Sequence, residues 1–215
     1  MTSGQYSPGT INFFEGSKDG FKSKRAIEEA PPEGSKADPN ATDQTMATMN
    51  LVDWDKDGDL DMVIGSTAGT VAVNLNEGSP KAAKFGRRRP VLGIDEKPLR
   101  VCQKSDPLPI DWDGDGNLDL LVGDEAGDVN FFRGTKDRKF ERGVSLFSGA
   151  ELPTKPSYAA IKKSLGDHPT IPGYRLRLDV ADWNGDGKLD LLVGNCEAED
   201  DAPDLHGFVY LLIRE

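Results

Sequence analysis

Cysteine and histidine are scarce in this chain of 215 residues, which has two of each. Cys102 and Cys196 lie far apart in the sequence and form no Cys-x-x-Cys pair. The sequence therefore predicts neither a disulfide framework nor a zinc site. Two interpretations stay open for the cysteines: a single bridge between them, or two free, buried thiols.

Positive charge and long apolar segments are lacking as well. The net charge is −11, from 37 acidic and 26 basic residues. Because a nucleic-acid binder must offer Lys and Arg to phosphates, this balance argues against nucleic acid and favours cations as ligands. The longest uncharged apolar run covers only residues 207–213, and the N-terminus has neither a basic nor an apolar signal region. We therefore expect no membrane span and no signal peptide in this chain.

Catalytic motifs are also missing from the sequence. It contains no Gly-x-Ser-x-Gly, no His-Glu-x-x-His, no P-loop and no Gly-x-Gly-x-x-Gly before a helix. The histidines, His168 and His206, are interpreted as surface residues, the second in the loop before the last strand. No catalytic residue is predicted.

What the chain does contain is a repeat. Three segments align without a gap, and each has one of the three tryptophans at its second place: DWDKDGDLDMVIG (53–65), DWDGDGNLDLLVG (111–123) and DWNGDGKLDLLVG (182–194). Each is followed by Gly-x-Val and an alternating apolar stretch, starting at Gly69, Gly127 and Gly207. A further copy of this second half starts at Gly9, and a third element starts at Gly20, Lys84 and Lys139.

Each repeat reads as four short strands, which in the first full copy cover residues 46–52, 60–64, 70–75 and 85–92. Four antiparallel strands per repeat form the blade of a β-propeller, so the predicted fold class is all-β. The third strand is apolar on both sides, which indicates that each blade is buried between two neighbours.

The repeat also predicts the domain organisation. About three and a half blades are present, whereas closed propellers have about four to eight. We therefore expect the rest of a larger propeller to come from upstream sequence or from a second chain. The predicted divisions are the last strands of a partial blade (1–30), a linker loop (31–45), a blade (46–95), a second blade (96–150), an insertion (151–173) and a last blade (174–215).

The acidic loops between the first two strands are candidate metal sites. Numbered from the first Asp, all three copies have an oxygen-bearing side chain at positions 1, 3, 5 and 9 and a Gly at position 6. Position 7 varies, as expected if only its backbone carbonyl binds. The candidate ligands are Asp53, Asp55, Asp57, Asp59 and Asp61; Asp111, Asp113, Asp115, Asn117 and Asp119; and Asp182, Asn184, Asp186, Lys188 and Asp190.

Hard oxygen ligands at alternate positions of a flexible loop favour Ca²⁺ over Mg²⁺, which demands a stricter octahedron. We therefore predict about three Ca²⁺ per chain, with Asp59, Asn117 and Lys188 binding through their carbonyls. An EF-hand is excluded because position 12 is Ile64, Val122 or Val193 instead of Glu. The alternative is that these loops are only solvated Asp-Gly turns.

On these residues the chain resembles the FG-GAP/VCBS repeat family, which includes the blades of the integrin α-subunit head. The similarity rests on the D-x-D-x-D-G-x-x-D loops, the LDLLVG-type strand and the Gly-x-Val strand. It implies a structural Ca²⁺ in each loop and an extracellular or cell-surface location.

Two functions follow as hypotheses. The first is a calcium-stabilised, non-enzymatic module that mediates extracellular protein or glycan binding, as in cell adhesion, with the ligand unidentified. The second is the scaffold of a secreted carbohydrate-active enzyme, a lyase or hydrolase, whose catalysis lies upstream or in the insertion. Residues of that insertion with suitable chemistry are Tyr158, Lys162, Lys163 and His168.

Overall fold

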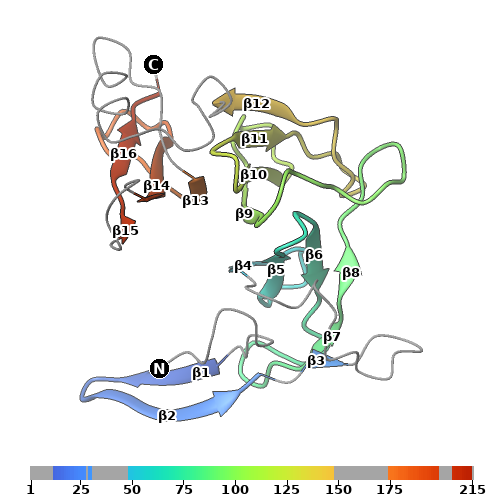
Figure 1. The fold of residues 1–215 in the computed structure, drawn as a ribbon. Coiled ribbons are helices and arrows are strands. Elements are labelled where there is room, and N and C mark those ends of the chain that lie inside the picture. Colours follow the sequence, from blue (N-terminus) through green and yellow to red (C-terminus); the bar gives the residue numbers. More distant parts are fainter. Residues whose placement is uncertain (1–11, 28, 31–47, 148–173, 199–204, 215) are drawn as a thin grey trace.

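The fold was analysed in a computed structural model that describes residues 12–27, 29–30, 48–147, 174–198 and 205–214. All regular structure in this part of the chain is β (Figure 1). None of the described residues forms a helix long and apolar enough to cross a membrane. The predicted linker at 31–45 and the insertion at 151–173 lie outside the described residues.

The strands follow one another in short segments. They are β1 (Asn12–Ser17), β2 (Gly20–Ala26), β3 (Glu29–Ala30), β4 (Met49–Val52), β5 (Asp61–Gly65), β6 (Val71–Asn74), β7 (Phe85–Arg87), β8 (Arg89–Pro90), β9 (Asp106–Ile110), β10 (Asp119–Gly123), β11 (Val129–Phe132), β12 (Val144–Phe147), β13 (Tyr174–Ala181), β14 (Asp190–Ala198), β15 (Leu205–His206) and β16 (Val209–Leu212).

Three antiparallel sheets share one plan. The first sheet has the order β4-β5-β6-β8, the second β9-β10-β11-β12, and the third β13-β14-β16, with β15 pairing the far end of β14. The register is also shared, because Asp61, Asp119 and Asp190 start the second strand opposite the last residue of the strand before. The three sheets follow one another along an arc (Figure 1). The predicted all-β, propeller-type fold is confirmed.

Two details of the strands differ from the prediction. The fourth strand of the first repeat is divided: β8 pairs β6, whereas β7 lies parallel to β3. The division falls at Arg88, between the two short strands. In the third sheet β14 continues past Gly194 to Ala198, and the chain returns through β15, which contains His206. The placement of His206 in a loop was therefore wrong.

The N-terminal segment forms a separate two-stranded antiparallel sheet. β1 pairs β2, with Asn12 opposite Ala26. The rings of Phe14 and Phe21 meet edge to face, with centroids 6.1 Å apart. Two paired strands agree with the partial blade expected at 1–30, although that division of the chain stays a prediction.

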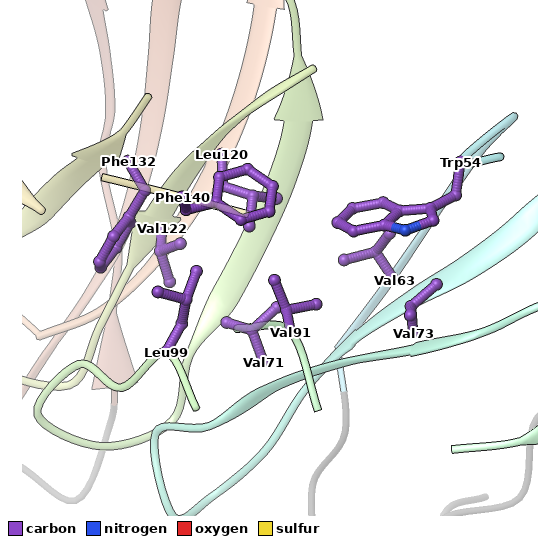
Figure 2. Close-up of a cluster of buried hydrophobic side chains, with 10 residues drawn as sticks. All are labelled: Trp54, Val63, Val71, Val73, Val91, Leu99, Leu120, Val122, Phe132 and Phe140. Carbon is purple, nitrogen blue, oxygen red and sulfur yellow. The ribbon is translucent and has the colours of Figure 1, made fainter. Parts of the chain in front are cut away.

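The core lies between successive sheets. Val63 of β5 packs with Leu120 and Val122 of β10, and Figure 2 shows Trp54 reaching from the first sheet towards Phe140. Leu121, which lies between them in β10, points to the other side, into a cluster that includes Leu191 and Val193 of β14. Because neighbouring residues of a strand face opposite sides, β10 is buried on both faces.

The outer face of the third sheet is open. Val209 is 73% exposed, whereas Val71 and Val129, at the same place in the repeat, are 1% and 0% exposed. Trp183 is 63% exposed, against 7% for Trp54. The expectation that both faces of the third strand are buried was therefore wrong for this sheet, because no described sheet follows it.

The cysteines are free thiols. Cys102 is exposed and Cys196 is half-buried. The bridge is therefore absent, and the expectation of burial was wrong for Cys102.

Candidate metal centres

The three acidic loops occupy the same place in each sheet. Loop 1 (residues 53–61) joins β4 to β5, loop 2 (111–119) joins β9 to β10, and loop 3 (182–190) joins β13 to β14. Each loop ends on a buried Asp that is the first residue of the second strand. The core between the sheets therefore fixes one end of every loop, and the rest of the loop can be organised by its own polar side chains.

The Asp at position 9 fastens each loop to its sheet. In every repeat one carboxylate oxygen accepts the N–H of the tryptophan at position 2, at 2.9 Å. The other oxygen accepts the N–H that follows the third strand, from Asn76 (2.7 Å), Gly134 (2.7 Å) or Arg214 (2.9 Å). These carboxylates are buried. Their repeated role is to satisfy backbone donors that would otherwise be buried without a partner.

The Asp at position 1 closes the loop around itself. Asp53, Asp111 and Asp182 each accept the N–H of the glycine at position 6, at 3.0–3.2 Å. These glycines have φ angles of 95°, 83° and 86°, a region that only glycine adopts without strain. The turn predicted at position 6 is therefore present. The carboxylates at position 5 accept the N–H at position 7, so each acidic side chain folds back on the loop.

Loop 1 gathers carboxylates around one point. Oxygens of Asp53, Asp55 and Asp61 lie within 4.8 Å of one another. The Oδ1 atoms of Asp55 and Asp59 are buried and accept no hydrogen bond from any described residue. Asp59 itself is only 6% exposed. Its side chain is thus buried, in contrast with the half-buried Asn117 and the exposed Lys188 at the same position.

The electrostatics of loop 1 disfavour negative charge. Burial, followed by repulsion from Asp57, raises the pKa of Asp59 above its ordinary value, although the side chain of Asn76 opposes the effect; repulsion from Asp55 and Asp53 adds less. Burial also raises the pKa of Asp61, although the N–H groups of Asn76 and Trp54 oppose the effect. A bound cation would relieve both the repulsion and the unsatisfied oxygens.

Loop 2 gathers a different set of carboxylates, and one of them is paired with an arginine side chain. Oxygens of Asp111, Asp113 and Asp115 lie within 4.8 Å of one another. Arg133, which follows β11, donates from Nε to Asp113 Oδ2 at 2.6 Å, and its second guanidinium nitrogen forms an ion pair with the same oxygen. The hydrogen bond to Asp113 raises the pKa of Arg133 further above its ordinary value. The N–H of Asn117 lowers the pKa of Asp115.

Loop 3 has the fewest carboxylates. Position 3 is Asn184, whose Oδ1 accepts the N–H of Asp186 at 3.0 Å. Among the described residues, the carboxylates of Asp182, Asp186 and Asp190 are not within 4.8 Å of one another as a group of three. The N–H of Lys188 lowers the pKa of Asp186. Loop 3 therefore brings together only part of its predicted ligand set.

Basic residues join loops 1 and 2 to the next repeat, and sequence reasoning missed them. Arg138 donates to the carbonyl of Asp55 at 2.6 Å, and Lys56 donates to the carbonyl of Gly116 at 3.4 Å. Arg214 donates to the carbonyl of Trp112 at 2.6 Å and lies 4.9 Å from the centre of its ring. Loops 1 and 2 border a cavity of about 170 Å³ between them.

The fold and these loops define a class: an all-β protein built from propeller-type repeats, each with an acidic loop after its first strand. Residues 111–193 match the model of a family described as an FG-GAP-like repeat. Residues 111–193 are therefore similar to FG-GAP-like repeats, which confirms the family predicted from the loops and strands for this part of the chain. A comparison with curated proteins gives no match. The finer likeness to VCBS and integrin α repeats stays a prediction.

Proposed function

We propose that this chain is a calcium-binding β-propeller repeat module in which the metal is structural. The observation that carries the proposal is the arrangement in loop 1, where the carboxylates of Asp53, Asp55 and Asp61 converge. The Oδ1 atoms of Asp55 and Asp59 are buried there and have no hydrogen-bond partner among the described residues. Because Ca²⁺ binds oxygens at about 2.3–2.6 Å, oxygens around one ion lie within about 5 Å of one another. The 4.8 Å grouping fits this requirement.

The residues that would hold the ion differ slightly from the sequence prediction. In loop 1 they are Asp53, Asp55 and Asp61, joined by the buried carboxylate of Asp59. In loop 2 they are Asp111, Asp113 and Asp115. Bound calcium supplies positive charge that neutralises these carboxylates and fixes the loop. The protein's own contribution is to hold the oxygens at the correct spacing through the hydrogen bonds at positions 1, 5 and 9.

A structural role for the metal is supported by the contacts between repeats. The carbonyls of Asp55 and Gly116, which belong to the acidic loops, accept hydrogen bonds from side chains of a neighbouring repeat. An ion that fixes a loop therefore also fixes the contact between two sheets. Binding free energy then becomes folding free energy.

The module acts in binding and not in catalysis, outside the cell, and presents surface loops to a protein or glycan. The open outer face of the third sheet is where the rest of the propeller, from upstream sequence or a second chain, packs. Support comes from Val71 and Val129, which are the equivalents of Val209 in the first two sheets. Both are buried against the next sheet. Tyr158, Lys162, Lys163 and His168, the candidates of the enzyme-scaffold hypothesis, lie outside the described residues.

Thermal unfolding tests the calcium proposal. The purified chain is measured in excess chelator, and then with increasing Ca²⁺ or with Mg²⁺ as control. At a Ca²⁺ concentration about 100 times Kd, each site adds about 2.7 kcal/mol, or about 5–10 °C in Tm for a chain of this size. Mg²⁺ is expected to give a much smaller shift at the same concentration.

Matched variants locate the effect. Asp55→Asn is expected to remove most of the shift due to loop 1, whereas Asp19→Asn, an exposed carboxylate outside the loops, leaves it unchanged. Equal Tm values in chelator, Ca²⁺ and Mg²⁺ would contradict the proposal and leave the loops as acidic turns.

A further inference from the structure

The three loops differ most at position 3. Asp55 in loop 1 has a buried oxygen without a hydrogen-bond partner among the described residues. Asp113 in loop 2 has both oxygens engaged, one by Arg133 and the other by the N–H of Asp115 at 3.2 Å. Asn184 in loop 3 is a neutral amide. Position 3 therefore offers an oxygen without a hydrogen-bond partner in loop 1, a carboxylate paired with arginine in loop 2 and an uncharged amide in loop 3.

Arg133 is peculiar to the second repeat. It is the residue directly after β11, and the residues directly after β6 and β16 are Leu75 and Ile213. Neither of these can neutralise a carboxylate. Arg133 is half exposed while Asp113 is only 17% exposed, so the guanidinium covers the carboxylate from the solvent side.

We propose that Arg133 is a built-in counter-cation of loop 2, which calcium must displace from Asp113 before it binds there. This inference rests on the proposed calcium function. It makes loop 2 a weaker site than loop 1, because part of the binding free energy is spent on breaking the Arg133–Asp113 pair. It also makes calcium binding at loop 2 release a charged side chain to the surface.

Charge counts point in the same direction. Loop 1 has five carboxylates, whereas loop 2 has four and the adjacent guanidinium. Affinity of calcium loops rises with the charge of the ligand set and the rigidity of the site. A hydrogen bond between two ionised groups is stronger than one between neutral groups, although the partial exposure of Arg133 weakens this pair. Removal of the pair is therefore expected to tighten calcium binding at loop 2 about two- to fivefold.

A residue-resolved calcium titration tests the inference. The amides of Gly58, Gly116 and Gly187 lie at position 6 of the three loops, so their NMR signals report each loop separately. In the unmodified chain, the Gly116 signal is expected to reach half-saturation at a higher Ca²⁺ concentration than the Gly58 signal.

Two variants and a control sharpen the test. Arg133→Leu, which installs the type of side chain found in the first repeat, is expected to move the Gly116 midpoint about two- to fivefold lower and leave Gly58 unchanged. Arg133→Lys keeps the charge but not the planar fork, and is expected to fall between the two. Arg142→Leu, which removes an exposed charge from the same repeat, leaves the Gly116 midpoint unchanged.

The possible failures are distinguishable. If all three glycines respond to Ca²⁺ but both Arg133 variants leave the Gly116 midpoint in place, the counter-cation role is wrong and the calcium function stands. If Arg142→Leu shifts the midpoint as much as Arg133→Leu, the effect is general charge and not the pair. If no glycine responds, both proposals are overturned.

Discussion

At the scale of single residues, the aspartates of one loop have two different tasks. Asp119 is buried and accepts backbone N–H groups from Trp112 and Gly134, whereas Asp115 is exposed and accepts only that of Asn117. The first task is needed with or without a metal. The second task concerns the metal, because Asp115 holds the loop in shape and is one of the residues that would bind the cation.

This division predicts that two alanine variants differ in how much stability they lose in chelator. Asp119→Ala leaves buried N–H groups without a partner and is expected to lower the free energy of unfolding by about 3 kcal/mol. Asp115→Ala is expected to lower it by less than about 1 kcal/mol but to remove calcium binding at loop 2. Urea unfolding in chelator, followed by a calcium titration, measures both. Equal losses of stability would contradict the division of tasks.

A second prediction at this scale concerns pH. Asp106 is 5% exposed, and burial raises its pKa above 3.8, although Arg177 and the N–H of Leu178 oppose the effect. The folded state therefore holds this proton more tightly than the unfolded state. The contribution of Asp106 to stability is present below pH 3.8 and is lost as pH rises through the raised pKa.

Comparison with Asp106→Asn isolates that contribution, because the Asn side chain is uncharged at every pH in this range. The stability of the unmodified chain relative to this variant is expected to fall between pH 3.8 and pH 7 in chelator, measured by urea unfolding. A difference that stays constant or increases with pH would show that the pKa is not raised.

The site was predictable from the sequence to the extent that it is local. The spacing of Asp and Gly within nine residues fixed the loop, its turn at position 6 and its candidate ligands. The partners that come from other elements were not predictable in this way. Arg133 lies about twenty residues from Asp113, and Arg138 about eighty from Asp55, so only the folded sheets bring them together.

At the scale of elements, the third strand shows how one sequence pattern meets different surroundings. Val129 of β11 is fully buried, whereas Val209 of β16 is 73% exposed. Alternation of apolar residues indicates which side of a strand faces a neighbour, but it cannot indicate whether that neighbour is present. For this reason the prediction of two buried faces succeeded for β11 and failed for β16.

Matched truncations in these two strands should therefore differ. Val129→Ala is expected to lower the free energy of unfolding by about 2 kcal/mol, because it removes buried apolar surface and leaves a cavity. Val209→Ala is expected to change it by less than about 0.5 kcal/mol. Urea unfolding of the two variants measures the contrast. A loss of similar size at Val209 would show that this face is covered in solution.

At the scale of the whole molecule, the sheets are stacked in series and each contacts mainly its neighbours. The second sheet has a described sheet on both sides, whereas the third has one on one side only. In repeat proteins stability is roughly a sum over units and their interfaces, so the third sheet lacks one interface term.

Amide hydrogen exchange is expected to follow this order. Amides of β10 (Asp119–Gly123) should be the most protected, and those of β16 (Val209–Leu212) should exchange fastest among the paired strands of the three sheets. Exchange followed by NMR in the presence of calcium gives the comparison. Uniform protection across the three sheets would mean that they unfold as one cooperative unit.

The tryptophans at position 2 turn this gradient into an optical signal. Trp54 is buried, Trp112 is half-buried beneath Arg214, and Trp183 is 63% exposed. One indole thus sits beside each acidic loop, in three surroundings of increasing polarity. The wavelength of their emission maxima should increase in the same order, and iodide in solution should quench the fluorescence of Trp183 most strongly. Without any added label, the chain carries a separate light-emitting reporter for each of its repeats.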